Sequence, residues 1–192
     1  NLIGQDTTQY GRDMKMTNGL VRLLAAMEEI PHLAWIRLLY AYPTGITKAL
    51  SKTLAESRKV VHYLDITIQH ASDKILKAMR RPDTSRRLRA LVDDLRSAIP
   101  DIVLRTTLIV GFPGETQAEF DELLEFVRWA QFDALGAFTF YPEPGTPAAG
   151  LSDQVPDETK QARLDELMLV QQEIAFARSR RRIGTQVTCL ID

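Results

Sequence analysis

The residues best suited to chemistry alternate with apolar residues along strand-like segments. Within Ile102–Val110, Arg105 and Thr107 fall on one face, because successive side chains of a strand point to opposite faces. Leucine and valine residues take the other face. A strand covered on both faces is apolar throughout, so this pattern predicts one face that opens onto a polar interior. The same pattern in neighbouring segments gives the full expected lining: Arg37, Asp65, Gln69, Arg105 and Thr107.

Buried charge is costly unless it is paired or bound to a ligand, so this lining has two interpretations. One is an arginine–aspartate network that only holds the strands together. The other, favoured because several strands contribute polar groups, is a wide, incomplete barrel with a polar ligand at its mouth. Ligands of α/β folds bind at the carboxyl ends of strands. Polar residues, glycine or proline follow the segments there, at Gln5-Asp6, Gln69-His70, Gly111–Glu115 and Tyr141-Pro142.

The segments that must position these residues alternate between strand and helix patterns. Such alternation predicts βαβ units and a parallel sheet, which either stays open or curls into a barrel. The predicted strands are Asn1–Gln5, Ala34–Tyr40, His62–Gln69, Ile102–Val110, Asp133–Tyr141 and Gln186–Ile191. The predicted helices span residues 17–29, 44–58, 72–79, 85–98, 117–130 and 157–182. Thr116 and Glu119 have the spacing of a capping box, and the long last helix should bury Leu164, Leu167, Met168, Gln171 and Ile174.

Composition excludes several classes of function. The chain has 192 residues and a net charge of -1, so no global field favours a nucleic acid or a membrane. It has no apolar run of the roughly 18 residues that a spanning helix needs. The one cysteine, Cys189, excludes a disulfide framework and a multi-cysteine metal site within these residues, and makes the cytoplasm the expected compartment. The three histidines have no zinc-type spacing.

The string TLIVGFPGE, at Thr107–Glu115, is the most specific motif. Two glycines after a strand, with a helix following at once, are typical of a tight turn and also of a loop that a ligand approaches closely. The whole string resembles the loop of radical S-adenosylmethionine (SAM) enzymes that packs on the adenine of SAM. The resemblance implies that Ile109 and Gly111 meet the adenine edge, and that Phe112 shapes the pocket.

Further strings resemble the methylthiotransferases of that family, in order along nearly the whole chain. NLIGQDTTQYG (1–11) is similar to their second barrel strand and loop. WIRLLYAYP (35–43), FTFYPEPGTPAA (138–149) and QVPDETKQARLDELMLVQQEIA (154–175) resemble the branch that acts on an aspartate of ribosomal small-subunit protein twelve. QHAS (69–72) also favours that branch, since transfer-RNA-modifying relatives have QSGS. The branch usually has proline at the position of Thr67.

The resemblance implies an incomplete, open parallel β/α barrel of the radical SAM type over residues 1–184. Residues 185–192 would begin a TRAM domain, a small β-barrel. The implied cofactors are SAM and two four-iron–four-sulfur clusters. Family members bind SAM through a CxxxCxxC cluster loop, and no such motif occurs here. The cluster ligands are therefore expected outside this chain, and catalysis is not expected from the fragment itself. The chain is expected to begin after the cluster loop and the first barrel strand.

No residue of the chain is assigned a catalytic or metal-binding role, and the candidates bind the cofactor. The expected SAM-binding residues are Gln5, Asp6, Arg37, Gln69, His70, Arg105, Thr107, Ile109, Gly111, Phe112, Glu115 and Tyr141. The implied partners are ribosomal protein twelve or the small subunit, with ribosomal RNA contact through the TRAM domain and no membrane. Three alternatives remain open: a transfer-RNA adenosine methylthiotransferase, an α/β-barrel enzyme without radical chemistry that binds a phosphorylated ligand at Gly111–Glu115, and a non-catalytic interaction module.

Overall fold

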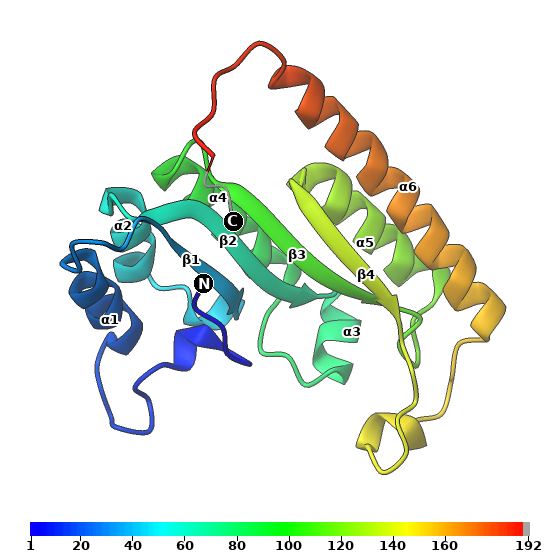
Figure 1. Cartoon of the computed structure of the whole chain (residues 1–192). Coiled ribbons are helices and arrows are strands. Elements are labelled where there is room, and N and C mark those ends of the chain that lie inside the picture. Colours follow the sequence, from blue (N-terminus) through cyan, green and yellow to red (C-terminus); the bar gives the residue numbers. More distant parts are fainter. Residues whose placement is uncertain (190–192) are drawn as a thin grey trace.

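The core of the molecule is a single sheet of four parallel strands in the order β1-β2-β3-β4 (Figure 1). The structure is a computed structural model and describes residues 1–189. The strands are β1 (Ile36–Ala41), β2 (Val60–Gln69), β3 (Val103–Val110) and β4 (Ala134–Thr139). Consecutive strands are neighbours in the sheet, as is usual for sequential elements, and all three pairs are parallel. The parallel α/β architecture predicted from the sequence is therefore confirmed.

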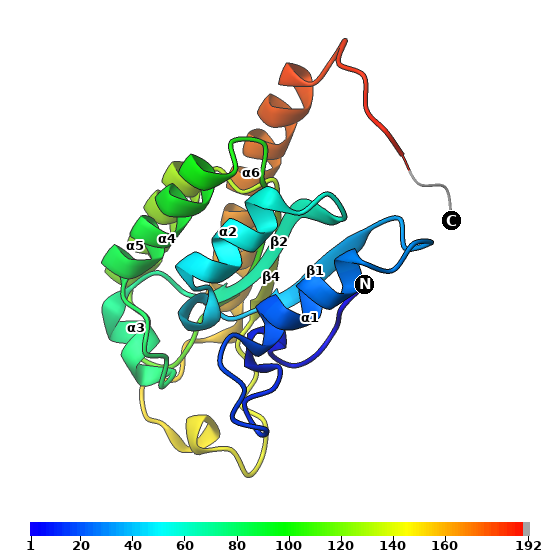
Figure 2. The same ribbon diagram turned by 90° about the vertical axis from the view of Figure 1, so that its left-hand side faces the viewer.

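Helices connect the strands and cover one face of the sheet. They are α1 (Gly19–Glu28), α2 (Lys48–Glu56), α3 (Asp73–Ala78), α4 (Ser85–Ala98), α5 (Gln117–Ala130) and α6 (Asp157–Arg181), with short 3-10 turns η1 (Thr7–Gln9), η2 (Pro43–Gly45) and η3 (Pro147–Gly150). Figure 2 shows α2, α4 and α5 on the same side of the sheet. Helix α6 runs beside β4 and α5, and the opposite face of the sheet stays open in Figure 1.

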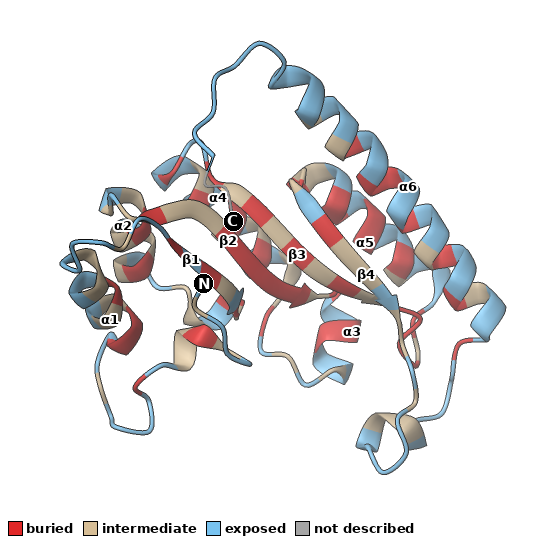
Figure 3. Ribbon diagram, in the orientation of Figure 1, coloured by how far each residue is buried: buried red, intermediate tan, exposed pale blue. Residues whose placement is uncertain are grey.

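The helix-covered face holds the fold together. Along β3, Leu104, Thr106, Leu108 and Val110 are fully buried, and the residues that alternate with them are only partly buried (Figure 3). The three apolar residues among them pack in one core with Phe120 and Phe126 of α5. Each such apolar side chain contributes about 1.5–3 kcal/mol by leaving water. The alternation of faces predicted for β3 is confirmed, and the apolar face is the one that the helices cover.

Helix ends follow local sequence signals. The capping box at the start of α5 is present, with the Thr116 and Glu119 side chains each bonded to the other's backbone. The backbone of Gln131 adopts a left-handed conformation (φ 48°) at the end of the same helix. Thr84 caps α4, where its side chain accepts a hydrogen bond from the backbone N–H of Arg87.

Two predicted strands differ from the structure. Asn1–Gln5 forms only one bridge, in which Leu2 pairs with Leu38, because the chain turns into η1 immediately afterwards. Gln186–Cys189 forms no strand, and positions 190–191 of that predicted strand lie outside the described residues. β4 ends at Thr139, two residues before the predicted end. On α6, Met168 is 38% exposed and Val170 is buried, so Met168 was wrongly assigned to the core.

Candidate functional site

The open face of the sheet carries a charged pair at its centre. Arg105 of β3 donates from Nη1 to Oδ2 of Asp65 on β2, at 2.9 Å. The two residues are direct partners in the parallel register, so their side chains leave the same face of the sheet. The Asp65 side chain is 3% exposed and that of Arg105 is 35% exposed. The Asp65 carboxylate is therefore buried, whereas the Arg105 guanidinium that binds it is still partly exposed to solvent.

A row of unsatisfied oxygen atoms lies on β2 beside this pair. Oδ1 of Asp65, Oγ1 of Thr67 and Oε1 of Gln69 are buried and have no hydrogen-bond partner among the described residues. A buried polar atom without a partner costs about 1–3 kcal/mol. Three such atoms on one strand therefore destabilise the fold. Two of them, the carboxylate and the amide oxygen, can only accept hydrogen bonds. A ligand that donates hydrogen bonds, such as a primary ammonium group, would satisfy them.

At Gln69 the alternation of side chains along the strand no longer predicts which face of the sheet a side chain leaves. Its register partner on β3 is Leu108, which points toward the helices, and the pairing is irregular between Ile66 and Gln69. The Gln69 backbone is also left-handed, with φ 73°. The irregularity arises at the carboxyl end of β2, where the chain departs toward α3. Parity placed Asp65 correctly, but it does not place Gln69.

The outer strands frame the pair with aromatic residues and one more cation. The Arg37 guanidinium of β1 lies 5.0 Å from the centre of the Tyr63 ring. Burial, aided by the negative charge of Asp65, raises the pKa of Tyr63. On β4, Phe138 is 62% exposed and is registered with Ile109, so it shares the open face with Arg105 and Thr107. Phe138 is therefore an apolar side chain on the open face, beside these polar residues.

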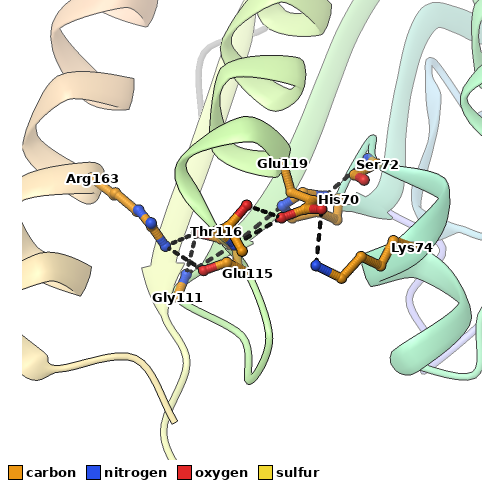
Figure 4. A network of polar contacts seen from close by, with 8 residues as sticks. All are labelled: His70, Ser72, Lys74, Gly111, Glu115, Thr116, Glu119 and Arg163. Atoms are coloured by element: carbon orange, nitrogen blue, oxygen red, sulfur yellow. Dashed lines mark hydrogen bonds and ion pairs between the residues drawn. The ribbon is translucent and has the colours of Figure 1, made fainter. Parts of the chain in front are cut away.

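A second polar group, the Glu115 network, lies just beyond the carboxyl ends of β2 and β3 (Figure 4). Glu115 Oε1 accepts a hydrogen bond from Nη1 of Arg163 on α6, at 2.8 Å. Both Glu115 oxygens lie 3.0 Å from the backbone N–H of Gly111. His70 Nε2 lies 3.2 Å from Oε2 of Glu115, and both side chains are completely buried. The network joins the loops after two strands to the last helix.

The hydrogen bonds of His70 define its tautomer. The backbone N–H of Ser72 donates to His70 Nδ1 at 3.0 Å, so Nδ1 carries no proton. Nε2 must then carry the hydrogen and donate it to the Glu115 carboxylate. His70 is thus a neutral donor that helps to hold an anion.

Helix α6 also shapes the glycine loop. Gly111 has φ 73°, and a Cβ atom there would lie 2.3 Å from Cγ of Lys160. Only glycine fits both the backbone conformation and the covering lysine stem. Phe112, next along the loop, packs edge-on against Phe140 with ring centres 4.9 Å apart. The loop predicted from TLIVGFPGE is therefore fixed by packing from α6 and from the segment after β4.

The structure brings together some of the predicted residues and separates others. Arg105, Thr107 and Ile109 lie on the open face; Gly111, Phe112 and Glu115 lie in the loop after β3, and His70, in the loop after β2, contacts Glu115. Gln5 is exposed, and the Asp6 carboxylate instead accepts the backbone N–H of Thr8 at the start of η1. Tyr141 lies past the end of β4 and is 70% exposed.

Sequence reasoning did not find Arg163 or Lys160, although a signal was present. Both are buried, three residues apart, at the start of α6. Arg163 precedes the buried Leu167 by one helical turn, so a charge stands on the apolar stripe of the helix. A buried cation demands a buried anion, and that demand points to Glu115.

The donor chemistry fits SAM in part and does not fit an iron–sulfur cluster. The unsatisfied acceptors and the Arg105 guanidinium suit an amino acid moiety, which bears an ammonium and a carboxylate. Cluster iron requires several thiolates, and the sequence has only Cys189, which is exposed. Within residues 1–189, no three acidic, histidine or cysteine side chains are grouped to hold a metal ion. No helix in this part is long and apolar enough to cross a membrane.

An open sheet of parallel strands with polar groups at the carboxyl ends is the arrangement at which α/β proteins bind ligands. The sequence profile of the Radical SAM superfamily matches residues 4–127. The chain belongs to this superfamily. It is 51% identical over 192 residues to the ribosomal protein uS12 methylthiotransferase RimO of Geobacter sulfurreducens and 49% identical to the protein of that name from Chloroflexus aurantiacus. It is covered completely in both cases, and spans 43% and 42% of those relatives.

Solved structures agree on the fold. The Escherichia coli coproporphyrinogen III oxidase HemN, a radical SAM enzyme, aligns over 84% of this chain and 36% of its own, with a TM-score of 0.61 and 20% identity. The archaeal Elp3 of Methanocaldococcus infernus aligns over 90% of this chain and 43% of its own, with a TM-score of 0.53 and 12% identity. At these identities the likeness concerns the α/β architecture alone.

Proposed function

We propose that this chain is the SAM-binding core of a methylthiotransferase that adds a methylthio group to the β-carbon of an aspartate on ribosomal small-subunit protein twelve. The observation that carries the proposal is the 51% identity, over all 192 residues, to a relative named for that activity. The unsatisfied oxygens beside Arg105 support the same conclusion, because they suit a zwitterionic amino acid group.

The open face and the carboxyl end of β2 supply the contacts in this proposal. Asp65 Oδ1 and Gln69 Oε1 accept hydrogen bonds from the SAM ammonium group, and Arg105 binds its carboxylate. Thr107, Ile109 and the backbone at Gly111 hold the nucleoside, with Phe112 beside it. Arg37 and Tyr141 lie at the rim, and Gln5 and Asp6 approach from the N-terminal segment. His70 and Glu115 act from below by fixing the loop. When bound beside a reduced cluster, SAM supplies a radical that abstracts hydrogen.

The clusters, the TRAM domain and the ribosomal target of this proposal lie beyond the SAM site. The ligands of two four-iron–four-sulfur clusters lie outside this chain, so the chain by itself binds SAM without cleaving it. Residues 1–184 form the partial barrel, and residues 185–192 begin a TRAM domain that contacts ribosomal RNA. The protein works in the cytoplasm, on ribosomal protein twelve or on the small subunit.

Binding of SAM tests the first part of the proposal. Isothermal titration of the chain with SAM should give a complex that Gln69→Asn weakens about tenfold, because the shorter amide loses a hydrogen bond to a charged group. Gln131→Asn is the matched control, since Gln131 also has a left-handed backbone (φ 48°) but lies at the far end of α5. Equal affinity in the two variants would remove Gln69 from the site.

A chimera tests the reaction. This chain replaces the matching 43% of the Geobacter sulfurreducens relative, which supplies the rest of the protein. After anaerobic reconstitution, mass spectrometry of ribosomal protein twelve should show one methylthio group on an aspartate. Methylthiolation of transfer-RNA adenosine instead would contradict the proposed target and favour the other branch of the family.

A further inference from the structure

A dense group of cations surrounds the connection between α3 and α4. The α3–α4 corner, defined as residues 77–87, contains Lys77, Arg80, Arg81, Arg86 and Arg87. Its one carboxylate, Asp83, is buried at 6% exposure and interacts electrostatically with Arg81 and Arg87, so one negative charge stands against five positive ones. Lys77, Arg80 and Arg86 are exposed and have no carboxylate partner among the described residues. The corner is therefore a positive patch on a chain whose net charge is -1.

The corner places arginines where local stability favours other residues. Arg80 has φ 57° just after α3, where the N–H of Arg81 bonds to the carbonyl of Leu76 at 2.8 Å. Glycine is the usual residue at such a helix end. Arg86 and Arg87 stand in the first turn of α4, although a helix N-terminus disfavours cations; the carboxylate that accepts the backbone N–H of Ser85 there is Asp73 of α3. Departures of this kind gather at functional sites.

One arginine of the corner packs on an aromatic ring and has a buried nitrogen without a hydrogen-bond partner among the described residues. The Arg81 guanidinium lies 4.5 Å from the centre of the Tyr42 ring, and its Nη1 is buried and unsatisfied among the described residues. Arg80 lines a pocket together with Met79, Phe112 and Pro147. Phe112 belongs to the glycine loop, so the corner adjoins the proposed SAM site at the carboxyl edge of the sheet.

We propose that the α3–α4 corner binds the phosphate backbone of structured RNA and so docks the site against its target. The inference rests on the proposed function, because a ribosomal protein in its assembled state is surrounded by RNA. Guanidinium groups pair with phosphates through two hydrogen bonds, and four of the five cations are arginines. An unpaired cation group beside the site is suited to a polyanion that borders the modified residue.

The arginines at the end of α6 differ from this corner. Arg178 and Arg182 both bind Asp133 at the amino end of β4, and Arg178 also binds the carbonyl of Gln131. They secure the helix and lie at the opposite edge of the sheet from the glycine loop. Arg180 and Arg181 are exposed and form no ion pair among the described residues. They provide a control of equal charge and exposure.

The test compares RNA binding by two double variants of the full chain. Fluorescence anisotropy with a labelled RNA hairpin, between about 50 and 200 mM KCl, gives both Kd and its salt dependence. Arg80→Gln/Arg86→Gln should weaken binding at least about tenfold and reduce the slope of log Kd against log salt by about 1.5. Arg180→Gln/Arg181→Gln should leave the slope unchanged. Arg80→Lys/Arg86→Lys should retain most of the slope, because the charge remains.

Equal losses in the two glutamine variants, or no RNA binding by the parent chain, would overturn the proposal. Preferential binding of polyglutamate over the hairpin would also overturn it and would indicate an acidic protein partner. The measurement needs neither SAM nor a cluster, so it is independent of the chimera's activity. RNA binding through the corner with an inactive chimera would contradict the proposed reaction alone. An active chimera without RNA binding would contradict the corner alone.

Discussion

Gln69 and His70 are adjacent in the sequence but belong to opposite kinds of polar region. His70 is completely buried, and both of its ring nitrogens have partners. Gln69 ends a strand on which three buried oxygens have none. In the Glu115 network the polar groups hydrogen-bond to one another, which fixes the two loops against α6. The acceptors on β2 have no partner among the described residues, as expected of the proposed ligand site. Hydrogen-bond satisfaction thus distinguishes residues that hold the fold from the proposed binding residues, whereas sequence position does not.

Removal of Glu115 should produce the largest effect and would test whether the Glu115 network is structural. Glu115→Ala leaves the buried Arg163 without its carboxylate and should lower the free energy of unfolding by about 3–5 kcal/mol. Urea denaturation measures the change. Glu56→Ala is the control: it breaks the ion pair with Lys52, but these side chains are 67% and 72% exposed, so less than about 1 kcal/mol should be lost. Similar losses in the two variants would contradict a structural role.

Two substitutions of His70 can separate its hydrogen bond with Glu115 from its hydrogen bond with the backbone of Ser72. His70→Gln can retain a donor near Glu115, and His70→Asn can retain an acceptor near the N–H of Ser72. Each should lower the free energy of unfolding by about 1–3 kcal/mol, and His70→Asn by more, because the lost bond involves a charged group. Thermal and urea denaturation give both values. A larger loss in His70→Gln would mean that the Ser72 contact dominates.

Substitution of one threonine on each of two neighbouring strands compares a hydroxyl that has a hydrogen-bond partner with one that has none. Thr106 of β3 donates to the carbonyl of Ile66 at 2.8 Å, so Thr106→Val should lower stability by about 1 kcal/mol. Thr67 Oγ1 has no partner among the described residues, so Thr67→Val should leave stability unchanged or raise it, while weakening SAM binding several-fold. Chemical denaturation and SAM titration of both variants measure this. Destabilisation by Thr67→Val would show that its hydroxyl is structural.

The smallest expected loss of stability comes from the capping box of Thr116 and Glu119, which follows Glu115 in the sequence. A hydrogen bond from Thr116, with a further one from Lys74, lowers the pKa of Glu119 to about 2. Because the folded-state pKa lies below the ordinary value of 4.5, its stabilisation is present above about pH 4.5 and is lost as pH falls toward 2. Glu119→Gln should lose about 0.5–1 kcal/mol at pH 7. This difference from the parent should shrink in acid; a constant difference would contradict the pKa.

The sequence predicted the four paired strands and the six helices well, because these depend on local periodicity. It failed where distant groups decide the outcome. Glu115 and Arg163 are 48 residues apart, and no local pattern links them. Asn1–Gln5 has the composition of a strand, but the Asp6 cap turns the chain away after Leu2.

The candidate site was predicted in the same uneven way. Alternation placed Asp65 and Arg105 correctly, because their register is regular. It could not reveal the irregularity before Gln69 or the exposure of Phe138, since both depend on neighbouring strands. The motif TLIVGFPGE indicated a ligand loop, yet the same letters do not distinguish Glu115 as a structural anion from Glu115 as a ligand contact.

Because α6 packs on the glycine loop, this helix should report on ligand binding at the proposed site. Lys160 covers Gly111, and Arg163 holds Glu115, so the loop cannot move without disturbing the first turns of α6. Coupling between two sites is reciprocal. A ligand that stabilises this loop must therefore slow amide hydrogen exchange at the start of α6, and a change that loosens the helix must weaken the ligand by the same factor.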